Sequence, residues 1–174
     1  MAISLYDISV ANYLQVLGST AGVLAKGADY ASANNLNPAE IVETRLRPDM
    51  QPFRFQVISV FHHSLGAIKG IKTGVFSPPP AMPDLDYTGL QGLVADAAAE
   101  LQAMPREEID ALEGKAMKFK MGDFEIPFNA ENFILSFSLP NFYFHATTIY
   151  DILRIAGVPL GKMDFLGTMR VSKP

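Results

Sequence analysis

The sequence predicts an all-α fold, an antiparallel four-helix bundle with long crossing loops and a small β-hairpin before the last helix. Apolar residues recur every three or four positions in four long segments, which is the spacing of helices that bury one face. The connections at about residues 35–51 and 71–87 are long and contain several prolines. Residues 115–127 alternate around Gly122-Asp123, which indicates a hairpin, and no pattern typical of parallel strands is seen.

The first helix is predicted to begin at Ser4, because Ser4 and Asp7 have the spacing of a capping box. Gly18 and Gly22 lie one turn apart in this helix, and each costs about 1 kcal/mol relative to alanine. We therefore expect a neighbouring helix to approach closely at these glycines. The helix should end near residues 34–35. Its apolar stripe comprises Val10, Leu14, Leu17, Ala21, Leu24 and Ala28.

The second helix follows a connection over residues 36–51, which includes a short helical turn starting at Pro38. Asp49 is expected to cap this helix, and Pro52 fits its first turn, where a missing N–H is no loss. The helix should run to about Lys69. Its apolar stripe comprises Ile58, Phe61, Leu65 and Ile68.

The middle of the chain should contain an ordered crossing loop at residues 77–83, because its four prolines exclude a helix. Residues 88–91 have a capping-box pattern and predict the start of the third helix. Residues 105–114 predict a separate short helix. The third helix has an apolar stripe comprising Leu90, Leu93, Ala97, Leu101 and Met104.

The last long helical region is predicted to begin near Asn129 and to end at about Ala156. Pro140 lies inside it, so we expect a kink or a break there. Gly157 should adopt the left-handed conformation that caps a helix, with Pro159 just beyond. With no internal repeat or linker, residues 1–174 are predicted to form one domain.

The composition is that of a folded protein, since 49% of the residues are apolar and 18% are charged. The net charge of -4 and the scattered basic residues argue against nucleic-acid binding. The absence of cysteine excludes disulfides, thiolate metal ligands and cysteine nucleophiles, and it fits a cytoplasmic protein. The first residues lack a signal-peptide pattern, and no unbroken apolar run approaches the ~20 residues that span a bilayer.

The last helix carries polar residues on the face that it should bury. Asn141, His145 and Thr148 recur at steps of four and three in one stripe. Burying an imidazole and an amide costs free energy unless each finds a hydrogen-bonding partner. Gln56 and His63 lie seven residues apart, so they share one face of the second helix. These residues define a candidate ligand-binding or polar cluster.

Tyr150 and Arg154 lie on or near the same helix and could anchor a carboxylate or a phosphate. Arg154 in the last turn could instead interact only with the helix dipole and solvent. His62 and His63 are adjacent, so at most one of them can point squarely into the interior.

Two long motifs resemble a known family over nearly the whole chain. They are Arg45-Leu-Arg-Pro-Asp-Met-Gln-Pro52 and Leu139-Pro-Asn-Phe-Tyr-Phe-His-Ala-Thr-Thr-Ile-Tyr-Asp-Ile-Leu-Arg154, the second continuing into Gly157-Val-Pro-Leu-Gly-Lys-Met-Asp-Phe-Leu-Gly167. The chain resembles a bacterial family of unknown function within the DinB/YfiT-like superfamily, whose members are regarded as metalloenzymes. The resemblance implies a four-helix bundle, often a homodimer, in the cytoplasm.

The wider superfamily often binds a divalent metal through three histidines, one on the second helix and two that lie four residues apart on the fourth. The resemblance places His145 at the last ligand and Asn141 at the other fourth-helix position. Gln56 is the best match on the second helix, and His63 could supply an imidazole instead. Amides are poor ligands for zinc and nickel, so the set favours hydrogen bonding without a cofactor, with zinc or nickel as the alternative.

Three functions remain open at this point. The first is a non-catalytic or small-molecule-binding bundle whose metal position has become a buried polar cluster. The second is a divalent-metal-dependent enzyme of hydrolase or thiol transferase type, and the third is a structural interaction protein with an exposed apolar face. Motifs for di-iron, serine hydrolase and phosphate-loop chemistry are missing from the sequence. The residues alone name no substrate or reaction.

Overall fold

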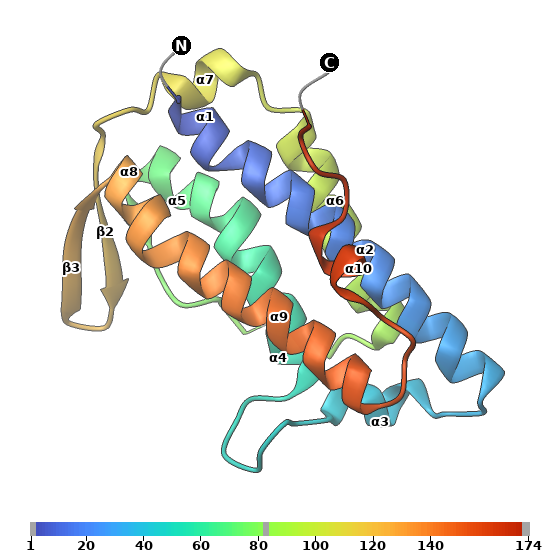
Figure 1. The fold of residues 1–174 in the computed structure, drawn as a ribbon. Helices are drawn as coiled ribbons and strands as arrows, with labels where there is room; N and C mark the ends of the chain where they lie inside the picture. The colour runs from blue at the N-terminus through green and yellow to red at the C-terminus, as the bar shows by residue number, and fades with distance from the viewer. Residues whose placement is uncertain (1–2, 82–83, 172–174) are drawn as a thin grey trace.

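The computed structural model describes residues 3–81 and 84–171, and it is largely helical with a small mixed sheet (Figure 1). The chain begins with α1 (Leu5–Ile8) and α2 (Val10–Ala33). The capping box of Ser4 and Asp7 is present as expected. The helix also ends where it was expected to, with Asn34 as the C-terminal cap and Asn35 in the left-handed conformation.

The glycines of α2 do not have the role that their spacing suggested. Gly18 and Gly22 are exposed, and a β-carbon built on either would meet no atom within 4 Å. The expected close approach of a helix at these positions is therefore wrong. It occurs instead at buried Gly27, where a β-carbon would clash with the hydroxyl of Tyr87.

The second helical region consists of α3 (Pro38–Glu43), then α4 (Phe53–Phe61), the π-helical turn η1 (His62–Gly66) and α5 (Ala67–Thr73). Pro52, rather than Asp49, is the N-terminal cap residue of α4, and no side chain caps that end. The helix continues one turn beyond Lys69 because Gly74, at φ 83°, supplies its left-handed end.

The third helical region contains α6 (Tyr87–Gln102) and the short α7 (Arg106–Asp110). Asp86 caps α6 by accepting a hydrogen bond from the backbone of Gly89, so the predicted cap at Thr88 is wrong by two residues. Residues 82 and 83 of the predicted crossing loop lie outside the described residues.

The sheet contains the expected hairpin and one strand that the sequence did not reveal. Strands β2 (Ala116–Met121) and β3 (Phe124–Asn129) pair antiparallel around Gly122, which has a φ of 61°. The two-residue strand β1 (Val75–Phe76) pairs parallel to β2 and completes the order β1-β2-β3.

The last helical region comprises α8 (Ala130–Phe133), the π-helical turn η2 (Ile134–Ser138) and α9 (Leu139–Ile155), followed by α10 (Lys162–Leu166). The region begins where it was predicted to, with Asn129 as its N-terminal cap, and Gly157 follows its end at φ 97°, as predicted. Pro140 neither breaks nor ends the helix. It lies in the first turn of α9, directly after η2, whose wider turn accommodates a ring that would clash with the preceding α-helical turn.

The long helices pack in neighbouring pairs, α2 against α6 and α4 against α9, and α10 lies on α2 (Figure 1). Within the described residues, the segment Leu5–Ala33 is long and apolar enough to cross a membrane, with a mean hydropathy of 1.2. The value is that of an 18-residue window of this segment, and half of that window is buried inside the protein.

Candidate functional site

A hydrogen bond between His145 on α9 and Gln56 on α4 lies at the centre of the candidate site. The distance from His145 Nδ1 to Gln56 Oε1 is 2.7 Å, and Gln56 is only 2% exposed. The expectation that the imidazole meets an amide from a neighbouring helix is confirmed. It arises because α4 and α9 pack side by side along their lengths.

A second hydrogen bond determines the proton positions in this pair. Gln56 Nε2 donates to the backbone carbonyl of Gln51 over 2.9 Å. Because a carbonyl can only accept, the amide nitrogen of Gln56 faces Gln51 and its oxygen faces His145. His145 must therefore carry its proton on Nδ1, which leaves Nε2 as the unprotonated nitrogen.

The other polar residues of α9 do not join this pair. Asn141 Nδ2 donates to the carbonyl of Phe137 over 2.7 Å, and the hydroxyl of Thr148 donates one turn back within its own helix. Tyr150 packs edge-on against Phe165, with ring centroids 6.2 Å apart. Arg154 is exposed and donates to the carbonyl of Val158 just beyond the helix end, so neither residue is brought to His145.

His63 lies beside His145. The two imidazole rings have centroids 6.0 Å apart and planes inclined by 18°. His63 is 9% exposed, and its buried Nδ1 has no hydrogen-bonding partner among the described residues. The adjacent His62 meets the ring of His63 edge-on at 5.6 Å, stacks on Phe76 and bonds to the carbonyl of Ser77 over 2.8 Å.

Burial makes all three histidines weak bases. It lowers the pKa of His145 to about 4. Burial, together with the neighbouring His62 and His145 rings, lowers the pKa of His63 to about 3. Burial also lowers the pKa of His62, although its bond to Ser77 opposes the effect. The cluster is therefore uncharged at neutral pH.

Ser138 joins the two π-helical turns, a link that the sequence did not indicate. Its hydroxyl donates to the backbone carbonyl of His63 over 2.6 Å. Because that proton is used, the hydroxyl of Tyr13 must be the donor in its own 2.8 Å bond to Ser138. All three groups are buried, so three segments distant in sequence meet at one serine. The sequence offers one local signal for this link, which is that Ser138 lies two residues before Pro140.

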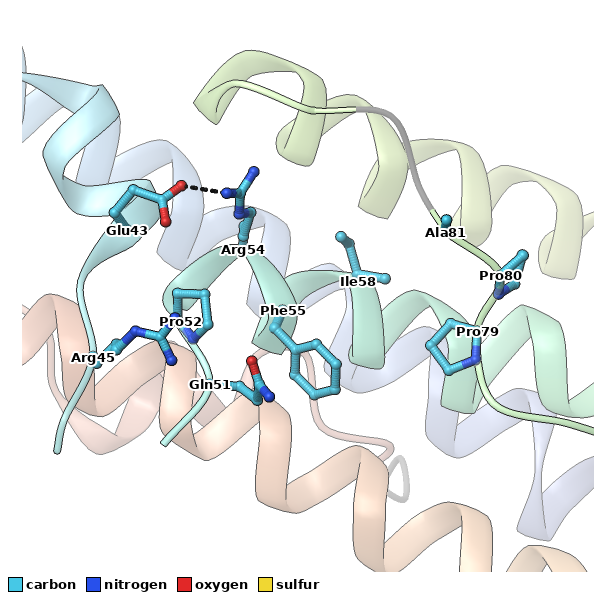
Figure 2. A pocket seen from close by; sticks show the side chains of 10 residues that line it. All are labelled: Glu43, Arg45, Gln51, Pro52, Arg54, Phe55, Ile58, Pro79, Pro80 and Ala81. Atoms are coloured by element: carbon cyan, nitrogen blue, oxygen red, sulfur yellow. Dashed lines mark ion pairs between the residues drawn. The ribbon is translucent and has the colours of Figure 1, made fainter. Parts of the chain in front are cut away.

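A cavity of about 400 Å³ adjoins the polar pair (Figure 2). It lies between the chain before α4, the first turns of α4 and residues 79–81, and Figure 2 shows Gln51 and Phe55 between Arg45 on one side and Pro79 on the other. The carbonyl of Gln51 holds Gln56, and the ring of Phe55 meets that of His145 edge-on at 5.9 Å. Sequence reasoning missed this cavity, although Arg45 to Pro52 is one of the two motifs.

Comparison with known protein families shows which family the chain belongs to. A family model described as a domain of unknown function, DUF1993, matches residues 5–166. The chain belongs to this family. Among solved structures, a crystal structure of a DinB family member from Shewanella denitrificans has a TM-score of 0.80 and 23% sequence identity, covering 98% of this chain and 96% of that one. No curated protein matches significantly.

The three-histidine metal site expected from the superfamily does not fit the side chains that this DUF1993 protein places there. Catalytic zinc usually takes three protein ligands, drawn from imidazole, thiolate and carboxylate. Across residues 3–81 and 84–171, no three such side chains gather closely enough to hold an ion. The amides of Gln56 and Asn141 are already hydrogen-bonded within the protein.

Proposed function

We propose that this DUF1993 protein is a cytoplasmic four-helix bundle that binds a small molecule, with the cavity beside α4 as its ligand site. The observation that carries the proposal is the chain of contacts from His145 through Gln56 to Gln51 and Phe55, two residues of the cavity wall. The buried polar pair then serves to hold the wall in place. The cavity volume lies within the range of small-molecule sites, about 300–1,000 Å³.

Filling the cavity tests this proposal. Gln51 is exposed and its side chain lines the cavity, so Gln51→Trp should occupy the space without disturbing the core. A fragment mixture monitored by ligand-detected NMR should give binders with the natural protein and none with the variant. Gln102→Trp, at an exposed position on α6, is the matched control and should keep them. Binders that survive Gln51→Trp would contradict the cavity as the site.

The alternative is a divalent-metal-dependent enzyme. It is supported by the buried, unpartnered Nδ1 of His63 beside the ring of His145. Elemental analysis of protein purified without a histidine tag measures the zinc and nickel bound per chain. Stoichiometric zinc or nickel that is lost in a folded His145→Ala variant would support the enzyme, and trace amounts of both metals would contradict it.

We also propose that the protein forms a homodimer through an exposed apolar face. The same face could serve the third function, that of a structural interaction protein. The outer face of α9 and the turn before it expose large apolar side chains, including Leu135, Phe144 and Ile155. Light scattering should give twice the chain mass of 19.0 kDa, falling to the single mass in Phe144→Ser with Ile155→Ser. A natural protein that stays at the single mass at high concentration would contradict the dimer.

A further inference from the structure

Arg45 and Gln51 are two side chains of the cavity lining whose polar atoms are not engaged by an acidic partner. The guanidinium of Arg45 uses Nη1 to donate to the carbonyl of Met50. Since a guanidinium has five N–H donors, most of its donors remain for a ligand. The side-chain amide of Gln51 has no hydrogen bond to any of the other described residues, and it faces the same space in Figure 2.

The second arginine of the cavity is already neutralised. Arg54 pairs with Glu43 over 2.8 Å and with Asp84 through its other terminal nitrogen. The cavity lining contains two arginines and one glutamate, and Arg54 is paired with that glutamate and with Asp84 outside the lining. Arg45 is the other cation of the lining, and within residues 3–81 and 84–171 it forms no salt bridge. An anionic group should therefore seat at the Arg45 end.

The remainder of the lining is apolar and rigid. The ring of Phe55 and the side chain of Ile58 form one wall, and Pro52, Pro79 and Pro80 form the others. Prolines and a half-buried aromatic ring lose little conformational entropy when a flat surface packs on them. The wall suits an aromatic ring or a branched aliphatic group of modest size.

We propose that the cavity binds a small monoanionic carboxylate with a flat or branched apolar body. The fork of Arg45 pairs with the carboxylate, the amide of Gln51 donates to it, and the body lies against Phe55 and the prolines. A dianionic phosphate fits less well, because the lining offers one unpaired guanidinium and also contains the carboxylate of Glu43. This ligand class rests on the proposed function of the same cavity.

The test uses a panel of aryl, cycloalkyl and branched-chain carboxylic acids, each with its matched primary amide and its phosphate-bearing analogue. Binding is followed by the methyl signal of Ile58, with the exposed Ile3 methyl as an internal reference. The best acids should bind about tenfold more tightly than their amides. Arg45→Ala should abolish this preference and leave the binding of the amides unchanged. Arg47→Ala, in the same exposed loop but outside the lining, should preserve it.

The possible outcomes separate the ligand class from the proposed function. If amides and acids bind equally and Arg45→Ala has no effect, while Gln51→Trp abolishes binding, the cavity is a ligand site and the carboxylate assignment is wrong. Phosphate analogues that bind more tightly than the acids would also overturn the assignment. If no member of the panel moves the Ile58 methyl signal, both proposals fail.

Discussion

The imidazole rings of His63 and His145 lie nearly parallel, with centroids 6.0 Å apart, although they come from η1 and α9. Neither ring has an acidic partner among its recorded contacts in the described part of the chain, and burial is the main cause of the low pKa of both. Their packing therefore favours the neutral form of both rings. Acid should destabilise the fold through these two rings.

The first prediction concerns the pH dependence of folding stability. Unfolded histidine has a pKa of about 6.5, whereas the folded pKa values are about 3 for His63 and about 4 for His145. The unfolded chain therefore binds protons first as the pH falls, so stability is complete above about pH 7 and declines towards the folded pKa values. Each ring should lower the free energy of unfolding by about 1–2 kcal/mol between pH 7 and pH 5, measured by urea denaturation.

His145→Gln isolates one ring from the other titrating groups. Carboxylates contribute equally to both proteins, so the loss of stability between pH 7 and pH 5 should be smaller in the variant by about 1–2 kcal/mol. An unchanged loss would mean that His145 takes up its proton as readily in the folded protein as in the unfolded chain.

The second prediction concerns the hydrogen bond between His145 and Gln56. Replacing either residue by alanine leaves a buried polar atom without a partner, so each change should cost about 1–3 kcal/mol of unfolding free energy. The double variant should cost less than the sum by about 1 kcal/mol, because the two losses share one interaction. Chemical denaturation of the four proteins measures this coupling. The control Gln102→Ala, exposed on α6, should have an unfolding free energy within about 0.5 kcal/mol of that of the natural protein. If the losses of the two single variants simply add in the double variant, His145 and Gln56 are not coupled.

The third prediction concerns Ser138. Ser138→Ala removes the partner of both the His63 carbonyl and the Tyr13 hydroxyl in a buried place, and we expect a loss of about 1–3 kcal/mol in thermal or urea unfolding. Ser136→Ala changes the same π-helical turn on its exposed side, where the hydroxyl bonds only within its own helix. It should have little effect on stability. Equal losses in both variants would mean that the hydrogen bonds of Ser138 between the two turns add no stability beyond that of an ordinary exposed serine.

The helices were predictable from the sequence where the determining signal is local. Ser4, Asn129 and Gly157 act through neighbours a few residues away, and the structure places all three as predicted. The strand β1 was missed because it has two residues, and its pairing depends on β2, more than forty positions away. The π-helical turn η1 contains no proline, so its sequence reads as ordinary helix.

The residues of the candidate site also fall into those that the sequence could predict and those that it could not. Helical periodicity was enough to place His145 inside, and the family resemblance nominated Gln56 as the residue of the second helix that meets it. Periodicity could not show that Asn141 bonds within its own helix, since the stripe alone does not say which polar side chain reaches across. Arg45 was beyond such reasoning because it lies on an exposed loop, and its role depends on how residues 79–81 fold back beside it.

The last prediction uses three glycines of α2. Gly27→Ala would place a methyl group against the hydroxyl of Tyr87, which donates to the carbonyl of Leu24 over 2.9 Å, and about 3.1 Å from Leu153. Because all these atoms are buried, it should cost about 1–3 kcal/mol. Gly18→Ala and Gly22→Ala meet open space and should each stabilise the helix by about 0.5–1 kcal/mol.

Thermal unfolding measures the three variants on one scale, since about 1 kcal/mol shifts the midpoint by about 2–4 °C for a chain of this size. Gly27→Ala should melt lower than the natural protein, and the other two should melt higher. A stabilising Gly27→Ala would show that α2 and α6 are less closely packed than the Tyr87 contact requires. A Gly18→Ala variant that loses stability would indicate that another surface covers this face of α2 in solution. The dimer contact would then have to include α2 as well as the outer face of α9.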